Sequence, residues 1–76
     1  MCLGVPGKII SISENNVALA DVDGNQMEIS TRLLPEVKPD QYVLIHAGFA
    51  MELITEEIAT ETMYYLKELQ KLANEV

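Results

Sequence analysis

The fold is decided by residues 17–30, VALADVDGNQMEIS. In an extended chain, residues 17, 19 and 21 lie on one face, and residues 18, 20 and 22 lie on the other. Asp23-Gly24-Asn25 then closes a hairpin into a second extended run, Gln26 to Ser30. An Asp-Gly pair accepts the positive φ angles that tight hairpin turns need. The stretch therefore predicts two antiparallel strands joined by a short turn.

Upstream of this hairpin, the period of two begins at Lys8. Ile10 and Ile12 alternate with serines, which is typical of a strand with two different faces. A polar turn, Glu-Asn-Asn at residues 14–16, follows and leads into the hairpin. This segment predicts a further strand, antiparallel to the next one.

Downstream, two more bulky, β-prone runs follow, Tyr42 to His46 and Phe49 to Ile54, separated by Ala47-Gly48. A loop bracketed by two prolines precedes them, and we expect its Leu33-Leu34 pair to plug the core. Five short strands are too few for a sandwich, whereas a closed barrel of the OB type hides both sheet edges. The predicted fold is mainly β, a small OB-like five-stranded barrel with a C-terminal helix.

The period changes at Thr55, a suitable N-cap followed by the acidic pair Glu56-Glu57. The pattern predicts a helix over about residues 56–75, and Met63 and Tyr64 fall off its main apolar stripe. We expect the stripe to pack on the barrel up to Leu66 and to run past the barrel edge beyond it. The stripe consists of Ile58, Thr62, Tyr65, Leu66, Leu69, Leu72, Ala73 and Val76. The predicted organisation is one domain, with residues 1–54 as the barrel and its Cys-bearing arm and residues 55–76 as the helix.

Composition narrows the possible partners. The 76 residues carry a formal charge of −7, with only five basic residues. Nucleic-acid binders and anionic membrane surfaces both require clustered Lys and Arg, so proteins or a metal cation are the favoured partners. No apolar run approaches the ~20 residues of a membrane span, and no signal peptide is visible. We expect a cytoplasmic protein.

Two side chains could carry chemistry, Cys2 and His46. Removal of the initiator methionine would place the Cys2 thiol beside the amino terminus, where it could form a thiolate or bind a metal. The alternatives are a small hydrophobic residue for Cys2 and a structural histidine for His46. Two donors cannot complete the four ligands of a tetrahedral metal site. They would therefore supply part of the coordination shell of iron, zinc, copper or nickel. A thiolate–imidazolium enzyme would use the same pair, but no oxyanion or phosphate-loop motif accompanies it, so no enzyme is predicted.

Three stretches together carry a resemblance to a known family: MCLGVPGKI at residues 1–9, YVLIHAGFAMELI at residues 42–54 and TEE at residues 55–57. The chain resembles the HypC/HupF/HybG family of NiFe-hydrogenase maturation chaperones over nearly its whole length. The resemblance implies an OB-like barrel and a metallochaperone that handles an iron centre with cyanide and carbon monoxide ligands. It also implies the partners HypD and the hydrogenase large-subunit precursor, with HypE reached through the HypD complex.

The family's functional residues fall on specific positions of this chain. Its N-terminal cysteine corresponds to Cys2, its motif histidine to His46, and its Gly-x-Pro-Gly segment to residues 4–7. We therefore expect Cys2 and His46 as iron ligands. The expected partner-binding residues, which include the exposed end of the helix, are Cys2, Leu3, Gly4, Val5, Pro6, Gly7, Lys8, Leu69 and Leu72.

One departure and one alternative accompany the resemblance. Where the family usually has Gly-Asp before the YVLIH stretch, this chain has Asp40-Gln41, which bears on the conformation of that turn. The alternative is a small OB-fold nucleic-acid-binding module. Such a module needs a positive charge and stacking aromatic rings on its barrel face. The charge of this chain is negative, and its barrel segment offers only Tyr42 and Phe49 as aromatic rings.

Overall fold

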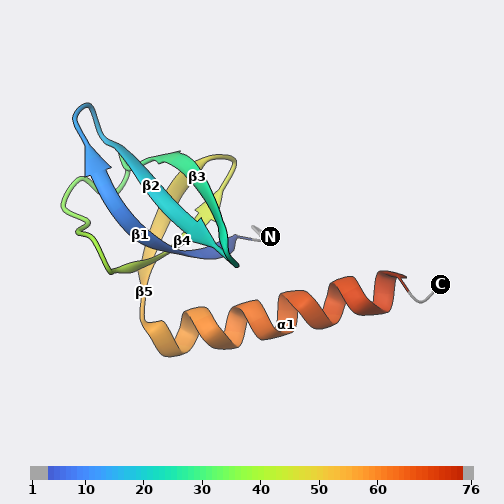
Figure 1. The fold of residues 1–76 in the computed structure, drawn as a ribbon. Helices are drawn as coiled ribbons and strands as arrows, with labels where there is room; N and C mark the ends of the chain where they lie inside the picture. Colours follow the sequence, from blue (N-terminus) through green and yellow to red (C-terminus); the bar gives the residue numbers. More distant parts are fainter. Residues whose placement is uncertain (1–3, 75–76) are drawn as a thin grey trace.

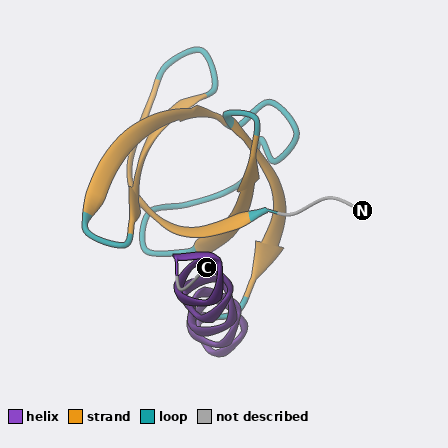
Figure 2. Cartoon of the chain, turned by 90° about the vertical axis from the view of Figure 1, so that its right-hand side faces the viewer, coloured by secondary structure: helices purple, strands orange, loops and turns teal. Residues whose placement is uncertain are grey.

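A computed structural model describes residues 4–74 as a β-barrel with one helix outside it (Figure 1). The sheet closes in the order β1-β2-β3-β5-β4, which confirms the predicted five-stranded OB-like barrel. Figure 2 shows the strands forming a ring and the helix lying against the outside of its wall. The elements are β1 (Val5–Ser13), β2 (Val17–Val22), β3 (Asn25–Ser30), β4 (Tyr42–His46), β5 (Phe49–Ile54) and α1 (Glu56–Asn74).

The long strand β1 closes the ring because its two halves have different neighbours. Its first half pairs with β4, and its second half pairs with β2, both antiparallel. A bulge at Ile10 interrupts the ladder with β2 between Ile9 and Ser11. The bulge also breaks the predicted alternation: Ile9 is fully buried, whereas Ile10 and Ile12 are each 39% exposed. The core residue of this strand is therefore Ile9.

Two of the strand connections are two-residue turns with positive φ at both positions. Asp23 (φ 52°) and Gly24 (φ 89°) join β2 to β3, as the sequence predicts. Ala47 (φ 53°) and Gly48 (φ 83°) join β4 to β5 in the same way. Such turns match the right-handed twist of the strands they connect.

The remaining seam of the barrel lies between β3 and β5, which are parallel and pair through Ser30 and Phe49. The Ser30 amide donates to the Gly48 carbonyl at 2.8 Å. The loop that follows covers one end of the barrel: Leu34 packs against the core, whereas Leu33 is 54% exposed. The expectation that both leucines plug the core is therefore wrong for Leu33.

The core is small, and most of it is aliphatic. A narrow barrel leaves room for few large side chains, so alanines fill several inward positions. Ala18 and Ala20 point inward, on the face of β2 opposite to Val17, Leu19 and Asp21. The buried core residues are Ile9, Ala18, Ala20, Ile29, Val37, Val43, Ile45 and Ala50.

Helix α1 begins as predicted, with the Thr55 hydroxyl accepting a hydrogen bond from the Ile58 amide at 3.1 Å. The helix packs against β1 and β4. Its contact face differs from the prediction, because Ile58 and Tyr65 are 49% and 60% exposed. The buried or half-buried side chains are those of Thr62 and Leu66, which belong to the predicted stripe, and of Ala59 and Met63, which do not.

Only a narrow line of the helix touches the barrel, and the small Ala59 side chain permits the closest approach. Beyond Leu66 the helix extends past the barrel (Figure 1), and Leu69 and Leu72 are 59% and 61% exposed. This agrees with the predicted projecting end, as far as residue 74. In the described part of the chain, no helix has the length and apolar character needed to cross a membrane.

Candidate functional site

The pairing of β1 with β4 brings the start of the described chain beside the only histidine. Val5 is opposite Ile45, and Pro6 is opposite Leu44. Continued by one residue, this antiparallel register sets Gly4 beside His46, the last residue of β4. The His46 side chain is exposed. His46 therefore lies at the surface, next to the point where the chain enters the barrel.

Residues 4–8 are built into the barrel wall. Gly4, Pro6 and Gly7 are all buried, and the stretch from Val5 onward is the first half of β1. A β-carbon at Gly4 would collide with Leu44 Cγ. Pro6 is tolerated because this half of β1 pairs only with β4, so its missing amide hydrogen interrupts no second ladder. The glycine–proline segment is thus a fixed part of the barrel wall that begins near His46.

Cys2 and Leu3, predicted as an iron ligand and a partner contact, lie outside the described residues. Among residues 4–74, no three His, Cys, Asp or Glu side chains are grouped as a metal site. His46 is therefore the one predicted iron ligand whose position the structure gives.

The turn before β4 keeps a glycine-like conformation although Asp40 occupies it. Asp40 has a φ of 71°, in the left-handed region that Asp tolerates better than most residues. Its amide donates to the Ile9 carbonyl, and the Ile9 amide donates to the Gln41 carbonyl, both at 2.8 Å. The Gln41 side chain accepts a hydrogen bond from the Lys38 amide at 2.8 Å. The departure from the family pattern therefore leaves this turn attached to β1.

The basic residues of the described chain form no cationic stripe. Lys8 lies 3.8 Å from an Asp40 carboxylate oxygen, and its ammonium is 5.9 Å from the centroid of the Tyr42 ring. Lys67 pairs with Asp23 at 3.0 Å. Both cations are already matched by carboxylates, so this surface is unsuited to a nucleic-acid backbone.

A groove of about 410 Å³ is lined by two of the predicted partner contacts, one from near each end of the chain. Val5 of β1 and Leu69 of α1 both line it. Leu72 lies one turn further along the helix and is exposed. The sequence analysis missed Val22 and Met63, which line the same groove. The only available signal for Met63 was its spacing of four residues from Ala59, which puts both side chains on one face of the helix. Nothing in the sequence shows that this face meets the barrel.

Comparison with known proteins agrees with this architecture. The model of the HupF/HypC family matches residues 1–66. The hydrogenase maturation factor HypC of Helicobacter hepaticus is 40% identical, with 99% of this chain and 90% of that protein covered. The HypC of Synechocystis is 38% identical, with 91% and 97% covered. A Proteus vulgaris protein named Frd operon uncharacterized protein C is 38% identical, with 100% and 85% covered.

The family match spans all five strands of the barrel and the first part of the helix, including the three quoted stretches and His46. The relatives align over nearly their own full lengths, so the similarity extends to the whole fold. The chain belongs to the HupF/HypC family of hydrogenase maturation factors.

Proposed function

We propose that this protein is a non-enzymatic metallochaperone acting in the cytoplasm. Together with HypD it assembles an Fe(CN)2CO unit and delivers that unit to the large-subunit precursor of a NiFe-hydrogenase. HypE takes part through the HypD complex. The iron is cargo in this scheme, held transiently and passed on.

One observation carries the proposal, namely the β1–β4 register, which pairs Val5 with Ile45, the neighbour of His46. Cys2 precedes Gly4 by two residues, a distance of at most about 7 Å along an extended chain. An exposed imidazole at the end of β4 is therefore within reach of the only thiol. Thiolate and imidazole are donors that suit iron.

The small number of protein donors fits a carrier. Two ligands from this chain leave positions open for cyanide, carbon monoxide and a ligand from the partner. A site with few protein donors can release its metal, whereas a closed set of four holds it as a structural element. A thiolate that acts together with the exposed His46 suits transfer better than a buried cage.

The partner surface proposed here consists of Cys2, Leu3, Gly4, Val5, Pro6, Gly7 and Lys8, together with Leu69 and Leu72. The groove shared by Val5 and Leu69 supports a single surface that includes both ends of the chain. Exposed leucines on a projecting helix end are typical contacts for a protein partner.

The test is co-purification with HypD followed by iron analysis and infrared spectroscopy of the complex. The wild-type complex is expected to hold iron and to show the stretching bands of bound cyanide and carbon monoxide. Cys2→Ala should remove both signals, and Ser13→Ala, at the far end of β1, should leave them unchanged. An iron-loaded Cys2→Ala complex with the same bands would refute the assignment.

A further inference from the structure

Helix α1 carries a seam of large apolar side chains that the barrel leaves uncovered. Figure 2 shows the barrel on one side of the helix only. The members of the seam are between 49% and 61% exposed, and they are Ile58, Tyr65, Leu69 and Leu72. This outer seam runs from the first turn of the helix into the part that projects past the barrel.

The outer seam has the spacing of a coiled coil. Ile58, Tyr65 and Leu72 follow one another at intervals of seven residues, which makes them d positions of a heptad repeat. Leu69 occupies an a position, and the half-buried Thr62 occupies the a position before it. Over about two heptads, side chains at a and d positions keep facing the same neighbouring helix. The outer seam therefore fits a second helix better than a strand or a loop.

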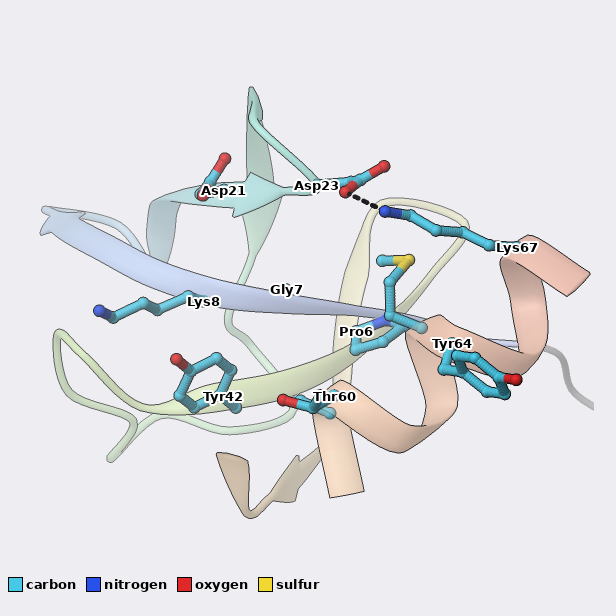
Figure 3. Close-up of a pocket in the computed structure, with 11 residues that line it drawn as sticks. Pro6, Gly7, Lys8, Asp21, Asp23, Tyr42, Thr60, Tyr64 and Lys67 are labelled. Carbon is cyan, nitrogen blue, oxygen red and sulfur yellow. Dashed lines mark ion pairs between the residues drawn. The ribbon is translucent and has the colours of Figure 1, made fainter. Parts of the chain in front are cut away.

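The barrel uses a different side of α1. Thr60, Tyr64 and Lys67 line a cleft between the helix and the barrel wall (Figure 3). Across this cleft, the Lys67 ammonium pairs with the Asp23 carboxylate at 3.0 Å. The barrel and a second helix can therefore contact α1 at the same time.

The charges beside the outer seam lie on one flank only. The g positions on that flank carry the exposed Glu61 and Glu68, whereas the e positions on the other flank carry Ala59, Leu66 and Ala73. Antiparallel pairing of two copies would bring the g flanks together and set glutamate against glutamate. Parallel pairing sets each glutamate beside the apolar e flank of the other copy. Two copies of this helix are therefore compatible in the parallel orientation.

We propose that the chain forms a parallel dimer in which the outer seams of two copies pack against each other. Four large side chains from each copy make an interface below about 1,200 Å² in total, at the small end for specific complexes. The dimer is therefore weak and reversible, and it forms without the proposed iron cargo or HypD. Leu69 and Leu72 are also proposed partner contacts, so the second copy covers them until a partner displaces it. That last consequence rests on the proposed function, whereas the dimer does not.

The experiment is sedimentation velocity of the full chain alone, between about 10 μM and 1 mM. The average mass is expected to rise with concentration from that of one chain toward that of two. Leu72→Ser should weaken the dimer by about tenfold or more, because it removes an apolar contact from both copies. Leu72 lies beyond the barrel contacts, so its loss leaves the fold in place. Leu33→Ser is the matched control, since Leu33 is an equally large, 54% exposed side chain on the loop before β4, and it should change nothing.

Two further measurements test the nature of the interface. Each copy carries a formal charge of −7, so higher salt should strengthen the dimer by screening the repulsion. Leu72→Cys, placed in a Cys2→Ser chain that has no other thiol, should give a cross-linked dimer with a short bismaleimide. Parallel helices place the two introduced thiols side by side, whereas antiparallel helices separate them.

Four outcomes would overturn the proposal. One is a chain that stays monomeric over the whole concentration range. Another is an equal effect of Leu72→Ser and Leu33→Ser, which would indicate non-specific association. A dimer that salt weakens would be held by charges instead of by the outer seam. A chain that dimerises but gives no cross-link through residue 72 would exclude the parallel arrangement. Because HypD and iron are absent throughout, none of these outcomes bears on the proposed function.

Discussion

Gly7 lies against Ile45 so closely that a β-carbon at residue 7 would sit 2.7 Å from Ile45 Cδ1. The same β-carbon would lie 3.1 Å from Val22 Cγ2. Ile45 is a core residue with 5% exposure, so its side chain has little space to move. Gly7→Ala is therefore expected to destabilise the barrel by about 1–2 kcal/mol through overpacking. Thermal unfolding followed by circular dichroism measures this loss.

A rescue variant tests the cause of that loss. Ile45→Val removes the Cδ1 atom, so the double variant should be nearly as stable as Ile45→Val alone. The resulting coupling free energy between the two sites should be about 1 kcal/mol. If the two single effects simply add, the clash at residue 7 is not the source of the destabilisation.

Cys2→Ala is expected to abolish hydrogenase maturation and leave the melting curve unchanged. The reason is that the substitution removes the proposed thiolate ligand and leaves in place every core side chain that the structure describes within residues 4–74. Hydrogenase activity in a host strain that carries only this variant gives the first readout, and the melting temperature gives the second. Normal activity with Cys2→Ala would contradict the assignment of the thiol.

His46→Ala is expected to lower maturation while changing the free energy of unfolding by less than about 0.5 kcal/mol. The side chain is exposed at the end of β4, so its removal creates no cavity. The same two measurements apply, with Gln26→Ala on the exposed side of the β2–β3 hairpin as the control. A large loss of stability with full maturation would instead assign His46 a structural role.

Ala47→Asn is expected to stabilise the protein by about 0.5–1 kcal/mol. Ala47 has a φ of 53°, which is costly for a residue with a β-carbon, and Asn accepts this conformation more readily. The expected rise in melting temperature is a few degrees for a domain of this size. Ala47→Val serves as the opposite control and should lower stability, since a β-branched residue fits positive φ poorly. Effects of the same sign in both variants would exclude backbone strain as the cause.

Truncation after Gln70 is expected to reduce affinity for HypD or for the hydrogenase precursor while the barrel stays folded. The removed segment includes Leu72, which is exposed, and excludes the side chains that pack on β1 and β4. Surface plasmon resonance with the immobilised partner measures the change. Leu69→Ser in the full chain should have a similar effect, because Leu69 lines the groove beside Val5. Full affinity in both variants would confine the partner surface to the N-terminal residues and the barrel.

Local signals in the sequence were sufficient for the barrel and for the start of the helix. The Asp23-Gly24 turn and the Thr55 cap depend on residues within a few positions of each other, and both are as predicted. The alternation in β2 separated its two faces but did not show that the Ala18 and Ala20 face is the buried one. Each of these features is fixed by backbone preferences that neighbouring residues impose.

Features that depend on distant contacts could not be predicted in the same way. The bulge at Ile10 lies within the ladder with β2, just beyond the part of β1 that pairs with β4, and no local pattern indicates it. The helix presents Ala59 and Met63 to the barrel, although Ile58 and Tyr65 are larger and apolar. A small domain cannot bury all of its apolar side chains, so size alone does not identify the contact face.

The β1–β4 ladder also sets the order in which the molecule can be assembled during synthesis. Val5 leaves the ribosome early, but its partner Ile45 belongs to the fourth strand. Pairings between residues so far apart in the chain form late, after the local hairpins. The surroundings of His46 are therefore completed only when most of the chain has emerged. A nascent chain cannot offer the finished surroundings of His46, so in the proposed function iron would be loaded only onto nearly complete molecules.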